Sequence, residues 1–241
     1  MATLHGSIIE KTITSTELED TRELLIYLPP NYSPLYTYDL LIAQDGSDYF
    51  QLGRLARQAD ELISENLIKD LIIVGVPYRS VKERSELYHP SGRKHEAFIR
   101  FLTTELVPYL DDHYQTHQLA SGRTLMGDSL AATVSLQAAF AYPNTFGQVI
   151  LQSPYVNDHV LTSVKAFGQP HILKVYHVIG KEETVVKTTD GKTKDFLTPN
   201  RELSKVMKER GFDIFYDEFN GDHTWKYWQP DLRRALLQMF A

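Results

Sequence analysis

RTLMGDSLAATVSLQAAF, residues 123–140, is the stretch of sequence that decides the fold. An apolar run leads into Gly127, and an apolar helix is expected from Leu130 to Ala141. A serine in a sharp turn between a strand and a helix is held in a strained conformation at the carboxyl end of the strand. Strand and helix approach closely there, so the residues two before and two after the serine must be small, as Gly127 and Ala131 are. The segment predicts an α/β fold with Ser129 as a candidate nucleophile, although an ordinary helix N-cap would also suit a serine.

Short apolar runs alternate with longer amphipathic segments along the rest of the chain. Several runs are nearly continuous Ile, Leu and Val, which is typical of strands covered on both faces. We expect strands at Glu23–Leu28, Asp39–Ala43, Asp70–Val76, Arg123–Met126, Gln148–Gln152, Ile172–Val178 and Asp213–Glu218. We expect helices at Gln51–Asn66, His95–His113, Leu130–Ala141, Asn200–Arg210 and Leu232–Phe240, and Pro108 should bend or shorten the second of these.

This alternation of strands and helices favours right-handed crossovers and a mostly parallel sheet. We therefore predict an α/β three-layer sandwich that forms a single domain over residues 1–241. The segments Ile8–Thr14 and Thr21–Leu28 are expected to form an antiparallel hairpin at one edge of the sheet.

The composition excludes several kinds of chemistry. The net charge is −6 with acidic and basic residues interspersed, and no block of Lys and Arg indicates nucleic-acid binding. The chain has no cysteine, which excludes disulfides, thiolate metal sites and a cysteine nucleophile. No signal peptide is visible, and no apolar run approaches the roughly 20 residues that span a bilayer. We therefore expect a cytoplasmic protein that binds neither nucleic acid nor membrane.

A histidine near the C-terminus is the candidate general base. The last predicted strand is followed by a glycine-containing loop that carries His223. Where a serine nucleophile lies on a strand–helix turn, the base follows a late strand and the acid comes between the two in chain order. We expect the acid after the strand before the last, where Glu183 is the first choice and adjacent Glu182 the alternative. Asp158, after the preceding strand, is a third and weaker candidate.

The loop after the strand Asp39–Ala43 is expected to complete the site. The backbone N–H of Ser47 in this loop and the N–H of Leu130 would form an oxyanion hole for the negative oxygen of an acyl-transfer intermediate. An Asp-Gly pair also occurs in ordinary turns, so its interest lies in its position after this strand. The residues expected to contact a substrate are Gly46, Asp48, Tyr49, Tyr155 and Trp225.

Two histidines offer an alternative kind of site. His113 and His117 lie four residues apart and could share one face of a helix, as zinc ligands often do. No third ligand is apparent near them, and histidines at the polar end of a helix are more often simply solvated. We therefore expect no metal ion.

Three blocks of the sequence resemble the putative esterase family that includes enterochelin esterase and esterase D. The blocks are YDLLIAQDGSDYF (38–50), LMGDSLAATVSLQAAFAYPNTFGQVILQSP (125–154) and FYDEFNGDHTWKYWQPDLRRAL (215–236). The family shows a Leu-x-Asp-Gly-like strand end, a Gly-x-Ser-x-Gly-like turn followed by Tyr-Pro and Phe, and a Gly-Gly-His-x-Trp-like ending. The likeness covers roughly residues 20–240, with Ala131 and Asp222 in place of two family glycines.

The resemblance implies an α/β-hydrolase fold and an esterase that uses Ser129, Glu183 and His223 and needs no cofactor. The expected partner is a small-molecule ester, and a homo-oligomer is left open. The same three residues would also serve a peptidase, thioesterase or acyltransferase, and a non-catalytic binding protein could keep the fold. The family's Arg…Glu-Leu element is matched only loosely by Val81–Tyr88, so Arg84 receives no substrate-binding role and siderophore esters are not implied.

Overall fold

One sheet of eight strands runs through the computed structural model, which describes residues 5–241. The strands lie in the order β1-β2-β4-β3-β5-β6-β7-β10. They are β1 (Ser7–Ser15), β2 (Asp20–Leu28), β3 (Asp39–Gln44), β4 (Leu71–Val76), β5 (Arg123–Asp128), β6 (Gln148–Gln152), β7 (Lys174–Gly180) and β10 (Asp213–Phe219). β1 pairs antiparallel with β2, and β2 with β4, whereas every other neighbouring pair is parallel. The predicted mostly parallel sheet and its antiparallel edge hairpin are confirmed.

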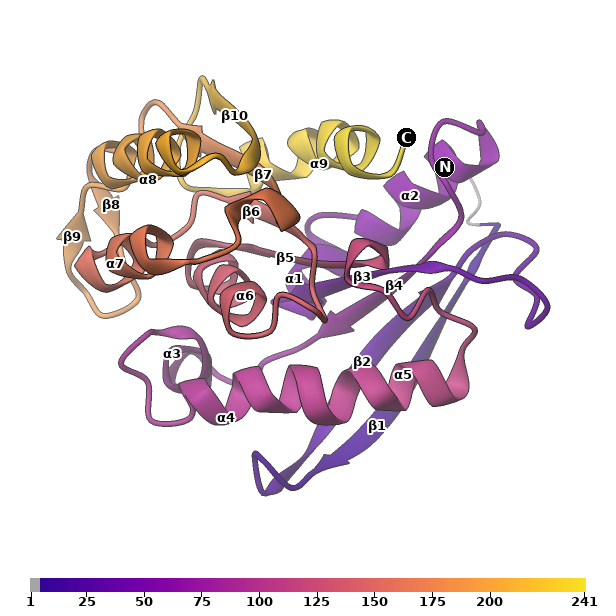
Figure 1. The fold of residues 1–241 in the computed structure, drawn as a ribbon. Helices are drawn as coiled ribbons and strands as arrows, with labels where there is room; N and C mark the ends of the chain where they lie inside the picture. Colours follow the sequence, from indigo (N-terminus) through magenta and orange to yellow (C-terminus); the bar gives the residue numbers. More distant parts are fainter. Residues whose placement is uncertain (1–4) are drawn as a thin grey trace.

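Helices cover both faces of this sheet, which gives three layers (Figure 1). They are α1 (Gly46–Gln51), α2 (Leu55–Ser64), α3 (Val81–Tyr88), α4 (His95–Arg100), α5 (Val107–His113), α6 (Ser129–Ala141), α7 (Asp158–Ala166), α8 (Leu197–Arg210) and α9 (Trp225–Phe240). Among residues 5–241 no helix has the length and apolar character needed to cross a membrane.

Successive side chains of the central strands point to opposite faces of the sheet and join separate hydrophobic clusters there. In β3, Leu40 and Ile42 join the buried cluster under α4, α5 and α6, whereas Leu41 and Ala43 join the cluster under α2 and α9. This alternation is the period of two that a strand imposes on its side chains. All six residues of β4 are buried, as the continuous Ile and Val run predicts.

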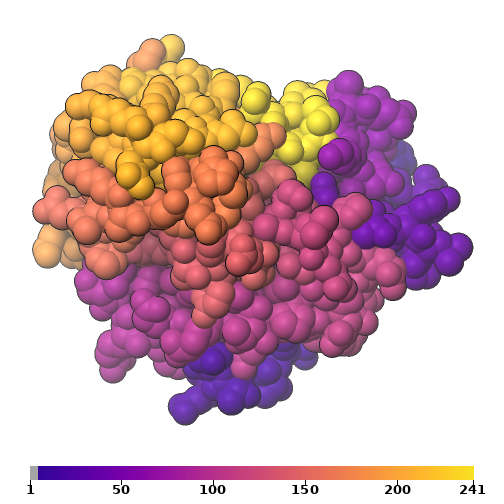
Figure 2. All heavy atoms as spheres, viewed as in Figure 1, coloured from indigo at the N-terminus to yellow at the C-terminus, as the bar shows by residue number. Residues whose placement is uncertain are grey.

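The parallel strands bring four loops to the same edge of the sheet. β3, β5, β7 and β10 run in the same direction, so the loops that follow Gln44, Asp128, Gly180 and Phe219 all emerge at their carboxyl ends. Segments of the C-terminal third gather on one side of the molecule, with the N-terminal strands at the opposite side (Figure 2). Ser129, Glu183, His223 and Ser47 follow these four strands, whereas Tyr155 and Asp158 follow β6.

Pro108 does not interrupt the long helix that the sequence predicts at 95–113. α4 passes through a π-helical stretch at Phe101–Leu106 and continues as α5, with Pro108 in the first turn of α5. A proline has no N–H to donate, so it is tolerated where the hydrogen-bond pattern of the helix changes. The helix is therefore not shortened at Pro108, and its hydrogen-bond pattern is that of a π-helix in the preceding stretch.

The main differences from the prediction are short elements. The helix predicted at 51–66 starts at Leu55, because Arg54 takes a left-handed conformation with a φ of 53°. β7 begins at Lys174 because Pro170–Ile172 form a short 3-10 turn. The sequence did not predict α1, α7 or a small hairpin of β8 (Val186–Lys187) and β9 (Thr193–Lys194).

Candidate active site

Ser129 lies at the sharp junction of β5 and α6. Its φ is 52°, in the left-handed region that serine rarely adopts, so the surrounding structure must hold the backbone there. A Cβ at Gly127 would lie 2.3 Å from the backbone of Ala131, which explains why this position needs glycine. The methyl group of Ala131 is fully buried and fits where such turns commonly have glycine. The junction presents Ser129 at the carboxyl edge of the sheet, beside the first N–H groups of α6.

Glu183 and His223 form a close pair. Oε2 of Glu183 lies 2.6 Å from Nδ1 of His223, and the Glu183 side chain is fully buried. The other oxygen of Glu183, Oε1, accepts hydrogen bonds from the Gly180 N–H at 2.8 Å and from the Ser153 hydroxyl at 2.6 Å. With Nδ1 donating to a carboxylate, Nε2 of a neutral His223 keeps its lone pair. The contact with Glu183 thus leaves Nε2 as the ring nitrogen that can accept a proton.

Aromatic residues fix the histidine ring. The centroid of His223 lies 4.5 Å from that of Phe196 and 4.8 Å from that of Trp228, which meets it edge-on. Nε1 of Trp228 donates to the Ser153 hydroxyl at 3.0 Å, and this hydroxyl in turn donates to Glu183. Ser153 and Trp228 thus hold the Glu183 carboxylate in place, and no local sequence pattern indicated this role.

The segment between Glu183 and Phe196 forms a loop whose two ends are joined by hydrogen bonds. The backbone N–H groups of Phe196 and Leu197 donate to the carbonyl of Glu183 at 2.9 and 3.1 Å. The β8–β9 hairpin lies inside this closed loop, and several of its residues line the pocket described next. The hairpin therefore borders the site, while the Glu183 carbonyl closes the loop that contains it.

Ser129 and His223 line the same pocket, which has a volume of about 240 Å³. Leu130, Asp48 and Tyr155 of the predicted site also line it. Among residues 5–241 no hydrogen bond joins the Ser129 hydroxyl to His223. Catalytic hydrogen bonds are often long without a substrate and tighten in the Michaelis complex. The structure thus brings nucleophile and base candidates to one cavity.

The two alternative acids lie outside this pocket. Glu182 and Asp158 are both exposed, and the backbone N–H of Glu182 donates to the carbonyl of Gly221 at 3.0 Å. Of the three carboxylates that the sequence offered, Glu183 is the one in contact with His223.

Gly46, Ser47, Tyr49 and Trp225 are not among the residues that line the pocket. A Cβ at Gly46 would lie 2.4 Å from the backbone of β4, so the loop packs directly on this strand. Tyr49 is fully buried, its hydroxyl donates to Gln152 at 3.1 Å, and its ring centroid lies 4.9 Å from that of Trp225. Tyr49 and Trp225 thus pack against each other outside the lining of the pocket, and a contact of Gly46, Tyr49 or Trp225 with substrate stays a prediction.

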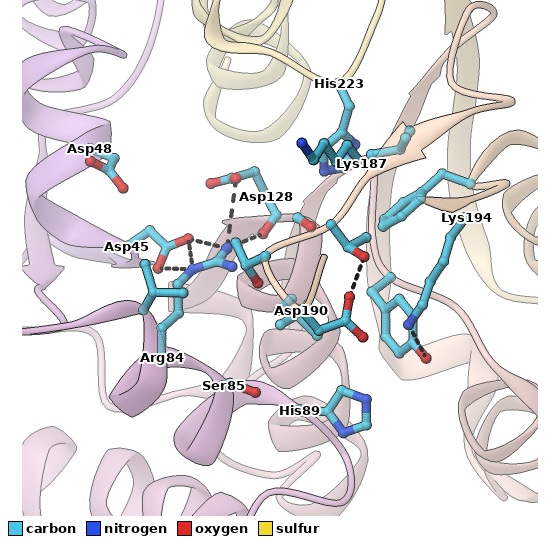
Figure 3. Close-up of a pocket in the computed structure, with 18 of the residues that line it drawn as sticks. Asp45, Asp48, Arg84, Ser85, His89, Asp128, Lys187, Asp190, Lys194 and His223 are labelled. Atoms are coloured by element: carbon cyan, nitrogen blue, oxygen red, sulfur yellow. Dashed lines mark hydrogen bonds and ion pairs between the residues drawn. The ribbon is translucent and has the colours of Figure 1, made fainter. Parts of the chain in front are cut away.

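Arg84 of α3 fixes the loop that follows β3. Its Nε lies 2.9 and 2.8 Å from the two carboxylate oxygens of Asp45, and its Nη2 lies 2.5 Å from one of them (Figure 3). Asp45 has a left-handed φ of 55°, and its N–H donates to the Tyr88 hydroxyl at 3.3 Å. Nη2 of Arg84 also lies 3.4 Å from the carbonyl oxygen of Asp128. Arg84 therefore ties the loop to the turn that carries the candidate nucleophile, which the sequence did not predict.

Asp128 belongs to the same buried cluster. Burial, and next the charge of Asp45, raise the pKa of the Asp128 carboxyl well above its usual value, and Arg84 opposes this rise. Oδ1 of Asp128 is buried without a hydrogen-bond partner among the described residues. A protonated Asp128 beside the Asp45–Arg84 ion pair leaves the cluster without a buried net negative charge.

His113 and His117 do not share a helix face. α5 ends at His113, and His117 lies beyond it with Nε2 4.0 Å from Asp39 Oδ1. Residues 5–241 contain no group of three or more His, Asp or Glu side chains arranged to hold a metal ion.

The fold and the site together define an α/β-hydrolase. Its loops after β5, β7 and β10 carry serine, glutamate and histidine in the chain order of this class. Residues 15–239 match the family described as putative esterase, and the chain belongs to that family. The protein is an esterase, that is, a carboxylic ester hydrolase.

Two curated relatives come from Bacillus subtilis strain 168. The uncharacterized protein YjcH is 53% identical over 239 residues, which cover 99% of this chain and 100% of YjcH. The uncharacterized protein YbbA is 22% identical over 203 residues, which cover 79% of this chain and 80% of YbbA. The likeness to YjcH thus extends over essentially the full length of both proteins.

Solved structures, two of them of esterases, share the fold. A ferulic acid esterase superposes with a TM-score of 0.80 at 15% identity, covering 99% of this chain and 98% of that one. Ferric enterobactin esterase from Salmonella typhimurium gives a TM-score of 0.84 at 19% identity, covering 99% of this chain and 59% of that one. The BES protein from Bacillus cereus gives 0.76 at 19% identity, covering 100% and 97%.

Proposed function

We propose that the protein hydrolyses small-molecule carboxylic esters through an acyl-enzyme, with Ser129 as nucleophile, His223 as base and Glu183 as the acid of a triad. One observation carries the proposal. The buried Glu183 carboxylate holds Nδ1 of His223 at 2.6 Å in the pocket that Ser129 also lines. Such a carboxylate selects the tautomer of the base and stabilises the imidazolium that forms during the reaction.

In the first step, Nε2 of His223 accepts the proton of Ser129 as Oγ attacks the ester carbonyl carbon. The carbonyl π electrons move onto the oxygen, and the tetrahedral intermediate collapses with cleavage of the bond to the alcohol oxygen. The alcohol leaves with the proton from His223, which leaves an acyl-enzyme. Water then repeats these steps, releasing the carboxylic acid and restoring Ser129.

The negative oxygen of each intermediate needs donors that are in place beforehand. We assign this role to the N–H groups of Leu130, in the first turn of α6, and Ser47, in the first turn of α1. The ion pair of Arg84 with Asp45 supports the assignment, because it fixes the residue that immediately precedes α1. Losing one oxyanion donor typically lowers kcat by about 100- to 1000-fold.

Hydrolysis of p-nitrophenyl acetate and butyrate by wild type and Ser129→Ala tests the proposal. We expect wild type to release p-nitrophenol and to react with a fluorophosphonate probe, and Ser129→Ala to lose both while keeping its circular dichroism spectrum. Ser121→Ala is a matched control, because Ser121 is exposed and precedes the same strand. Parallel assays with an amide and a thioester compare esterase activity with peptidase and thioesterase activity.

Two results would contradict the proposal. Full esterase activity in Ser129→Ala would show that another residue is the nucleophile. Neither turnover nor labelling in folded wild type would favour a non-catalytic member of the fold.

A further inference from the structure

The β8–β9 hairpin points a lysine into the pocket. Val186 and Lys194 are cross-strand partners, so their side chains lie on the same face of the hairpin. Val186 is buried in a cluster with Ile179 and Phe196. Lys194 therefore faces the interior side of the hairpin, and it lines the pocket.

The ammonium group of Lys194 rests on Tyr155 rather than on an acid. Nζ lies 4.5 Å from the ring centroid of Tyr155 and 3.4 Å from its hydroxyl. Among residues 5–241 no carboxylate lies within 4.0 Å of this Nζ, whereas the exposed Lys192 at the tip of the same hairpin pairs with Asp190 at 3.9 Å. Asp190 also lines the pocket, and a hydrogen bond from Thr188, helped by the charge of Lys194, lowers the pKa of its carboxyl, but the lysine and the carboxyl form no ion pair. The half-buried ammonium of Lys194 therefore keeps donors that can bind an anion.

This ammonium lies close to the reacting groups. The backbone N–H of Tyr155 donates to the carbonyl of Ser129 at 3.1 Å. Phe196, two residues after Lys194, contacts the His223 ring. His89 packs on the ring of Tyr155 at 5.4 Å, and burial followed by the charge of Lys194 lowers its pKa. The wall of Lys194 and Tyr155 is thus attached directly to the nucleophile turn.

The opposite wall of the pocket is acidic. Figure 3 shows Asp45 and Asp48 on one side of the pocket and Lys194 on the other. Asp45 is paired with Arg84, and Asp48 accepts a hydrogen bond from the Tyr78 hydroxyl at 3.1 Å. Arg84 offsets the charge of Asp45, so among the described residues Asp48 is the unpaired acid of the α1 side. The hairpin side carries Lys187 and Lys194 against Asp190. This charge balance favours an anionic substrate group on the hairpin side.

We propose that Lys194, together with the Tyr155 hydroxyl, binds a carboxylate carried by the ester substrate. The proposal rests on the esterase function above and names the substrate class of the same site. A lysine ammonium supplies three donors and the tyrosine hydroxyl a fourth, which suits the two oxygens of a carboxylate. The contact between Lys194 and the carboxylate would be present in both the bound substrate and the transition state. Removing Lys194 should therefore raise KM more than it lowers kcat.

Three esters test this proposal on wild type and Lys194→Met. They are neutral p-nitrophenyl butyrate, mono-4-nitrophenyl glutarate with a carboxylate on the acyl side, and 4-carboxyphenyl butyrate with a carboxylate on the leaving group. We expect Lys194→Met to lower kcat/KM about 10- to 100-fold for a carboxylate ester, as loss of a charge-assisted hydrogen bond would. The carboxylate ester whose kcat/KM decreases shows whether the natural substrate carries its carboxylate on the acyl group or on the alcohol. The kcat/KM for neutral p-nitrophenyl butyrate should change less than about threefold. Lys205 is an exposed lysine of α8, so Lys205→Met controls for the loss of one positive charge.

A binding measurement separates this proposal from the catalytic one. Calorimetric titration of Ser129→Ala with monobutyl glutarate and with 4-carboxyphenyl butyrate needs no turnover, and adding Lys194→Met should weaken binding about tenfold or more for one of them. Binding that depends on Lys194, together with wild type that shows no esterase activity, would support the subsite and overturn the triad. Equal losses for all three esters, or titrations unaffected by Lys194→Met, would overturn the subsite and leave the triad standing.

Discussion

Replacing Arg84 with methionine would leave Asp45 as a buried carboxylate without its cation. The side chains of Arg84 and Asp45 are 11% and 2% exposed, with contacts of 2.9, 2.8 and 2.5 Å between them. Removing one partner of a buried ion pair costs about 3–5 kcal/mol, because the remaining charge is left uncompensated. Methionine keeps much of the apolar stem, so lost packing contributes little. We expect the free energy of unfolding to fall by about 3–5 kcal/mol.

Urea unfolding followed by tryptophan fluorescence measures this loss, which corresponds to a melting temperature about 6–20 °C lower in a chain of this size. The double variant Arg84→Met, Asp45→Asn removes the stranded charge and should recover part of the lost stability. Arg57→Met is the control, because the exposed pair of Arg57 with Glu61 should contribute less than about 1 kcal/mol. A loss in Arg84→Met no larger than in this control would refute the reasoning.

Two further predictions concern the acid and a buried histidine. Glu183→Gln should lower kcat for p-nitrophenyl butyrate by on the order of 10³- to 10⁴-fold, whereas Glu182→Gln should stay within about twofold, and equal effects would show that the acid is misassigned. His177 is fully buried, and burial lowers its pKa from 6.5 to about 4, so the folded state lacks a proton that the unfolded state binds below pH 6.5. Its contribution to stability is complete above pH 6.5 and is lost as the pH falls toward 4, which amounts to about 2 kcal/mol between pH 7.5 and pH 5. His177→Gln should lose this part of the pH dependence in thermal unfolding, and an unchanged pH profile would contradict it.

The sheet was predictable because its central strands are encoded locally. β4 (LIIVGV) is a short apolar run that is buried throughout, which is typical of a covered strand. β5 (RTLMGD) is equally buried, and its short apolar centre is recognisable because the Gly127 turn and an apolar helix follow it. α7 was missed because only Val160 and Val164 of its nine residues are buried, too few to establish a helical period. The two-residue strands of the β8–β9 hairpin have no period at all, and their position depends on contacts with distant segments.

The candidate site shows the same division. Ser129 carries a local signal, because the strand–turn–helix context with Gly127 marks it. The sequence around Glu182 and Glu183 does not distinguish the two as the candidate acid. The distinction depends on which carboxylate contacts the Ser153 hydroxyl and His223, and both of these residues are distant in the chain. Arg84 could not be placed because its partner Asp45 lies 39 residues earlier in the chain.

The closed loop between Glu183 and Phe196 has a consequence for how substrate preference could change in evolution. Because the loop starts and ends at the carbonyl of Glu183, its length and sequence can vary without moving the carboxylate. The entropic cost of lengthening such a loop grows slowly, by about 0.6 kcal/mol for each doubling. The residues between Glu183 and Phe196 can therefore be replaced, inserted or deleted as a unit. Homologues could acquire new pocket walls there by insertion or deletion while the reacting groups stay under separate selection.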